Sequence, residues 1–203
     1  TQDPAHAACK HLPARWTAFQ NTLTLAPHVK DGPFHAVIPA GVLPHVPADG
    51  PALANMGMMI RSGGRMFVEF RNKLFSMFTF NRLTADFILD DLLAGVDAGV
   101  KDEVARAIKP RLAMELPPVR DRIADKDAPG YHAILSRFHN PFELLETVER
   151  SGFEDAQVHW YHYHPAPPML EGELGRASRK AAMALEHEGS WRGWFLCSAG
   201  VIE

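Results

Sequence analysis

The clearest structural signal in the chain is FHAVIPAGVLPHVPADGPALANMGMMIRSGGRMFVEF, residues 34–70. It opens with an apolar run over 34–38 that Pro and Gly close, which is typical of a buried parallel strand. Apolar side chains then recur every three or four positions over 52–60 and predict a helix. Ser-Gly-Gly at 62–64 predicts a turn, and residues 65–70 read as a second strand.

A strand, a helix and a second strand in this order form a βαβ unit. Such a unit packs as a right-handed crossover, with its two strands parallel in one sheet. We therefore expect residues 34–38 and 65–70 to lie side by side and to run in the same direction. All further expectations about this chain depend on that pair.

The rest of the chain alternates helical and extended patterns. Residues 73–100 are strongly apolar and 101–124 are charged, and both read as helical. Asn140 is a good helix cap and Pro141 a good first residue for the helix that follows. The remaining predicted elements are a helix over 140–151, a strand over 157–164, a helix over 171–188 and a last strand over 194–202.

Composition limits the classes of partner. A chain of 203 residues with 46% hydrophobic content fits one globular α/β domain. The net charge of −3 gives no basic excess for nucleic acid, and no apolar run approaches the roughly 18–20 residues of a membrane span. Cys9 and Cys197 belong to no CxxC pair and suggest free thiols in a reducing cytoplasm. The expected partner is a small molecule, with no nucleic acid and no membrane.

Two motifs in the opening stretch resemble class I S-adenosylmethionine-dependent methyltransferases. Val-Leu-Pro-His-Val at 42–46 is similar to the end of the family's fourth strand, and Ser-Gly-Gly-Arg at 62–65 to the turn into its fifth. SGFEDAQVHWYHYH and WRGWFLCSAGVIE, within 138–203, resemble the sixth and seventh strands. The resemblance implies an α/β fold over 1–203: a Rossmann-like, mostly parallel sheet with an antiparallel last strand, helices on both faces and a helical insertion or lid at 73–137.

The resemblance also implies S-adenosyl-L-methionine as cofactor. It places Asp3 at the ribose hydroxyls, Asn21 near the adenine, and Ala40, Gly41 and Val42 along the cofactor, although Gly41 also suits an ordinary turn. The family's first strand and glycine-rich loop would precede Asp3 and are not in the sequence. The expectation is therefore an N-terminally incomplete domain, or else a domain that lacks the loop and binds a partner without catalysis.

Residues for the methyl acceptor follow the two strands. His45 suits a general base, a residue that lines the pocket, or a structural histidine. Arg71 can hold an acidic group of the substrate or sit in solvent, and Asn72 is beside it. Aromatic and basic residues of the insertion can form a lid or belong to the core: Phe75, Phe80 and Arg82.

Three histidines invite a metal interpretation, because His162 and His164 share one face of a strand and His159 is close. No Cys or carboxylate is placed to complete the ligand set, although His139 or His132 could, and because the family usually needs no metal we expect none. The predicted activity is methyl transfer to a small molecule, with a hydroxyl oxygen favoured as acceptor. The alternative is a non-catalytic, methyltransferase-like binding domain.

Overall fold

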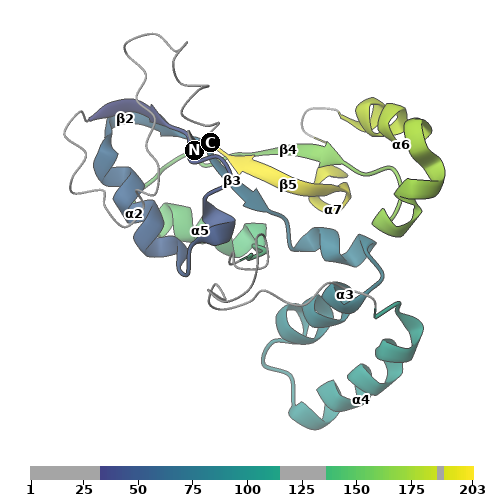
Figure 1. Cartoon of the computed structure of the whole chain (residues 1–203). Coiled ribbons are helices and arrows are strands. Elements are labelled where there is room, and N and C mark those ends of the chain that lie inside the picture. The colour runs from purple at the N-terminus through teal and green to yellow at the C-terminus, as the bar shows by residue number, and fades with distance from the viewer. Residues whose placement is uncertain (1–32, 115–135, 187–189) are drawn as a thin grey trace, which may run out of the picture.

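A computed structural model describes residues 33–114, 136–186 and 190–203 (Figure 1). The described chain is mixed α/β, with a parallel two-stranded sheet and an antiparallel three-stranded sheet. The strands are β1 (Phe34–Val37), β2 (Ile60–Met66), β3 (Val68–Arg71), β4 (Val158–Tyr163) and β5 (Cys197–Ile202). The longer helices are α2 (Asp49–Met59), α4 (Ala98–Ile108), α5 (Pro141–Arg150) and α6 (Glu171–Leu185). The short helices are η3 (Leu43–His45), η4 (Leu74–Phe78), α3 (Arg82–Asp86), η5 (Phe87–Leu92), η6 (Lys109–Arg111), η8 (Pro168–Leu170) and α7 (Gly193–Leu196).

The predicted parallel pair is confirmed, but the second strand, predicted over 65–70, begins at Ile60 and is interrupted at Phe67. β1 and β2 are hydrogen-bonded and parallel, with Val37 opposite Met66, and α2 connects them. The predicted glycine turn at 62–64 is wrong, because these residues lie within β2, where the register against β1 shifts. Gly64 reflects a close approach of the two strands, since a Cβ there would lie 2.9 Å from the carbonyl oxygen of His35.

The two sheets meet at one residue. Phe67 alone separates β2 from β3, and its N–H donates to the carbonyl of Val37 at 2.9 Å. β3 then pairs with β5, and β5 pairs with β4, both antiparallel. The last strand is therefore antiparallel, as predicted, and it lies between β3 and β4. It begins at Cys197 rather than at residue 194, because residues 193–196 form the short helix α7.

The main core lies between one face of these strands and two helices. α2 contributes Leu53 and Met56 and α5 contributes Leu144 and Val148 to one cluster of buried side chains, which also holds Val68, Phe70 and Ile202 from the strands. The sequence predicted one mostly parallel sheet with helices on both faces, whereas the described residues form two small sheets, one parallel and one antiparallel. Here α2 and α5 share a face.

The described part of the predicted insertion, 73–114, is helical but interrupted. Asn81 caps α3 by accepting from the Leu83 N–H, and the Thr84 hydroxyl accepts from the Asn81 N–H. This capping box, next to Phe80 with φ at +53°, breaks the continuous helix predicted over 73–100. No helix of the described residues is long and apolar enough to cross a membrane.

Candidate functional site

The loop that follows β1, with the predicted cofactor residues 40–42, lies beside β3. Ala40 and Gly41 are exposed, and Val42 is half-buried. The N–H of Gly41 donates to Oε2 of Glu69 at 2.7 Å, so a carboxylate of β3 holds the loop that follows β1. Gly41 has a φ of +65°, and a Cβ there would meet no atom within 4 Å. Asp3 and Asn21, the other predicted cofactor residues, lie outside the described residues.

Glu69 also joins β3 to β4 through Tyr161. Burial, together with the hydrogen bond to Glu69 and the negative charge of this carboxylate, raises the pKa of Tyr161 well above its usual range. The hydroxyl therefore stays protonated and donates to Glu69. Sequence reasoning missed Glu69, although it alternates with the buried Val68 and Phe70 and so had to face the opposite side of the sheet.

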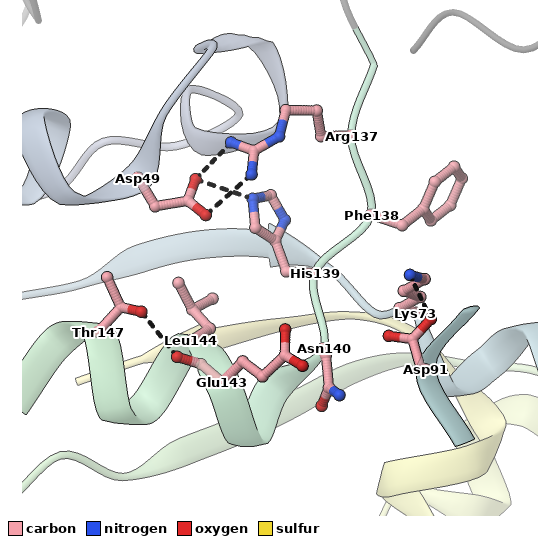
Figure 2. Close-up of a pocket in the computed structure, with 10 residues that line it drawn as sticks. All are labelled: Asp49, Lys73, Asp91, Arg137, Phe138, His139, Asn140, Glu143, Leu144 and Thr147. Atoms are coloured by element: carbon pink, nitrogen blue, oxygen red, sulfur yellow. Dashed lines mark hydrogen bonds and ion pairs between the residues drawn. The ribbon is translucent and has the colours of Figure 1, made fainter. Parts of the chain in front are cut away.

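A polar cavity of about 260 Å³ lies where α2 and α5 begin (Figure 2). α2 follows β1, and the residues before α5 pair with those after β3, so the cavity lies at the carboxyl edge of the strands. Open α/β sheets bind their ligands at this edge. It is lined by Asp49, Lys73, Asp91, Arg137, Phe138, His139, Asn140, Glu143, Leu144 and Thr147.

Asp49, in the first turn of α2, is the centre of a charged cluster in the wall of this cavity. Two nitrogens of Arg137 donate to its two oxygens at 2.6 and 3.0 Å, and Nε2 of His139 lies 3.2 Å from Oδ1. Burial by itself would raise the pKa of Asp49. The hydrogen bonds and charges of His139 and Arg137 outweigh burial and hold that pKa below its usual value.

Backbone hydrogen bonds fix the segment that carries Arg137 and His139. The N–H of His139 donates to the carbonyl of Arg71 at 2.7 Å, and the carbonyl of His139 accepts from the N–H of Lys73 at 2.9 Å. The N–H of Arg137 donates to the carbonyl of Pro44 in η3 at 2.8 Å. Lys73 also forms an ion pair with Asp91, another residue of the cavity lining, with Nζ 2.5 Å from Oδ2.

The predicted acceptor-binding residues after β3 are not brought together. Asn72 is 1% exposed, and its side-chain nitrogen donates to the carbonyls of Trp194 and Cys197, both at 2.8 Å. Its side-chain oxygen accepts from the Leu74 N–H at 3.0 Å, so it has a structural role instead of a substrate-binding one. Arg71 is half-buried and donates to the Ser136 hydroxyl, with its guanidinium 6.0 Å from the ring centre of Phe138.

The other predicted site residues lie outside the cavity lining. Phe75 is buried, and its ring packs against Phe78 and His164, which makes it a core residue. Phe80 is 49% exposed, and Arg82 is half-buried at the start of α3. His45 is half-buried at the end of η3, on the turn whose carbonyls bind Arg137.

Two of the three histidines considered as metal ligands have polar partners. His159 pairs with Glu203 at 3.2 Å, and His164 lies 3.0 Å from the Ser198 hydroxyl. Among the described residues, no group of three or more His, Cys, Asp or Glu side chains is arranged to hold a metal ion.

Comparison with protein-family models, with curated proteins and with solved structures finds no significant match to the chain.

Proposed function

We propose that this protein transfers a methyl group from S-adenosyl-L-methionine to a hydroxyl oxygen of a small molecule. The observation that carries the proposal is the direction of the strands. β1 and β2 are parallel, and the Phe67 N–H extends their pairing toward β3. β3 and β4 are each antiparallel to β5, so they run in the same direction as each other. A parallel set with an antiparallel last strand is what the resemblance to class I methyltransferases implies.

The loop after β1 fits the proposed cofactor. At Gly41 the backbone is exposed with open space beside it, so a nucleoside ligand can approach closely. Glu69 holds this loop at the edge of the sheet where ligands of open α/β folds bind. When bound, the cofactor supplies an electrophilic methyl group. The chain then has to align the acceptor oxygen with that methyl group and exclude water.

The proposal is tested by titrating the natural full-length protein with S-adenosylhomocysteine in a calorimeter. We expect saturable binding with one site per chain. A matched control is Arg150→Ala, which removes exposed contacts with Glu146 and Thr147 and should leave the affinity unchanged. The absence of heat at millimolar ligand would contradict methyl transfer and favour the non-catalytic binding domain.

A further inference from the structure

One buried nitrogen in the wall of the polar cavity has no hydrogen-bond partner among the described residues. The side chain of His139 is 3% exposed, and Nε2 is occupied by Asp49. Within the part of the chain that the structure describes, the second ring nitrogen, Nδ1, has no hydrogen-bond partner. An unsatisfied buried polar atom costs about 1–3 kcal/mol, so such an atom calls for a counterpart that the protein alone does not provide.

The protonation state of Asp49 determines whether Nδ1 of His139 lacks a hydrogen-bond donor or an acceptor. With its pKa lowered by His139 and Arg137, against the opposing effect of burial, Asp49 is ionised at neutral pH and only accepts hydrogen bonds. Nε2 of His139 therefore carries the proton and donates it. In the neutral ring Nδ1 then has a lone pair, so the missing partner is a hydrogen-bond donor.

The charged groups around the ring do not supply this donor. They come from α2 (Asp49), the segment before α5 (Arg137), the residues after β3 (Lys73), η5 (Asp91) and α5 (Glu143). Asp49 forms an ion pair with Arg137, and Asp91 forms one with Lys73 (Figure 2). The arginine and the lysine of the cavity wall therefore already have partners. A hydroxyl group of a bound ligand has the chemistry to be this donor.

Resting on the proposed methyl transfer, we propose that this cavity binds the hydroxyl of the methyl acceptor and that His139 is its general base, positioned by Asp49. His139 thus takes the role that the sequence suggested for His45. The location agrees with this role, because Arg137 donates to the carbonyls of Pro44 and Val46, directly after the proposed cofactor loop at 40–42.

The proposed step is balanced without another reactant. The acceptor oxygen forms a bond to the methyl carbon, and the electron pair of the carbon–sulfur bond returns to the sulfur. The hydroxyl proton passes to Nδ1 of His139 and later to water. Ionised Asp49 stabilises the imidazolium that forms, while Arg137 keeps Asp49 in place.

The test measures methyl transfer and cofactor affinity separately in the natural full-length protein. Methyl-tritiated S-adenosylmethionine is incubated with a low-molecular-mass extract of the source cells, and S-adenosylhomocysteine affinity is measured by calorimetry. We compare wild type, His139→Gln and Asp49→Asn with His159→Gln. The last variant is the matched control, since His159 also pairs with a carboxylate, Glu203, but lies outside the cavity.

We expect His139→Gln to bind S-adenosylhomocysteine normally and to lose about 100-fold or more in transfer. Asp49→Asn should lose at least about tenfold, since the ring loses its defined tautomer. His159→Gln should behave as wild type. Equal transfer by wild type and His139→Gln overturns the assignment but leaves the proposed function standing, whereas the absence of cofactor binding in wild type removes both.

A second measurement does not depend on turnover or on the folding of a variant. ¹⁵N shifts of labelled histidine in the wild-type protein report which ring nitrogen is protonated. We expect His139 to carry its proton on Nε2 at neutral pH. A proton on Nδ1 would overturn the proposal, whatever acceptors the extract contains.

Discussion

The carboxylate of Glu69 on β3 binds the backbone N–H of Gly41 after β1, with 2.7 Å between Oε2 and the nitrogen. The two residues are 28 positions apart, and this hydrogen bond fixes the loop at the end of one strand to its neighbour. Hydrogen bonds to a charged acceptor contribute about 1.5–3 kcal/mol. A side chain that the sequence did not single out therefore helps to hold the loop in place.

We expect Glu69→Ala to release this loop. The amide of Gly41 should exchange with solvent about tenfold faster or more, as measured by hydrogen exchange, because its acceptor is gone. Under the proposed function, affinity for S-adenosylhomocysteine should fall as well. Glu69→Gln keeps an acceptor oxygen and should show a smaller effect. Unchanged exchange in Glu69→Ala would show that other contacts hold the loop.

Asp49→Asn should destabilise the fold as well as slow the proposed reaction. The substitution leaves the half-buried Arg137 without its bidentate partner, which we expect to lower the free energy of unfolding by about 2 kcal/mol at neutral pH. Denaturant titration measures this change. Glu146→Gln is the control, because the exposed pair of Glu146 and Arg150 is worth at most about 0.5 kcal/mol.

The same carboxylate predicts how stability depends on pH. Asp49 has a lower pKa in the folded protein than its ordinary value of 3.8, so its ionised form favours folding. This contribution is fully present above the unfolded value and is lost as the pH falls through the folded one. Acid unfolding of Asp49→Asn should therefore be less steep than that of wild type. If the free energy of unfolding fell equally steeply with pH in both proteins, Asp49 would not have a lowered pKa in the folded state.

Local patterns predicted most of the elements correctly. The parallel pair of β1 and β2, the cap of α5 at Asn140 and the strand β4 follow from periodicity and capping residues within short windows. Local sequence patterns could not predict the polar cavity. Asp49 lies 88 residues from Arg137 and 90 from His139, and only the packing of α2 against the segment before α5 brings these groups together.

At Asn72 a local sequence pattern predicted a ligand site, and distant parts of the chain supply the partners of the side chain instead. A polar residue directly after a strand suggests a ligand site, yet its partners are carbonyls 122 and 125 residues away. Asn72→Ala would leave these buried groups unsatisfied and should lower the free energy of unfolding by about 3 kcal/mol. Chemical denaturation gives the value. A change below about 1 kcal/mol would mean that water replaces the side chain.

Two glycines should respond to alanine in opposite directions. At Gly193 a Cβ would lie 2.5 Å from the ring of Trp160, so Gly193→Ala should cost about 1–3 kcal/mol through overpacking. At Gly57, inside α2, a Cβ would lie 3.6 Å from the ring of Phe153, an ordinary contact. Gly57→Ala should stabilise the fold by about 0.5–1 kcal/mol. Melting temperatures that shift in the same direction would refute this packing.

The thiol of Cys197 should be inert in the folded protein. The residue is fully buried, and burial raises its pKa from 9.0 to about 12, against the weaker opposing effect of a hydrogen bond from Tyr163. Because the thiolate is the reactive form, a shift of this size leaves about a thousandfold less of it. Labelling by a maleimide, followed by mass spectrometry of the peptide that carries Cys197, should proceed only as denaturant unfolds the chain. Glutathione in the same mixture is the control, and native Cys197 that reacts at the rate of glutathione would show that β5 opens readily.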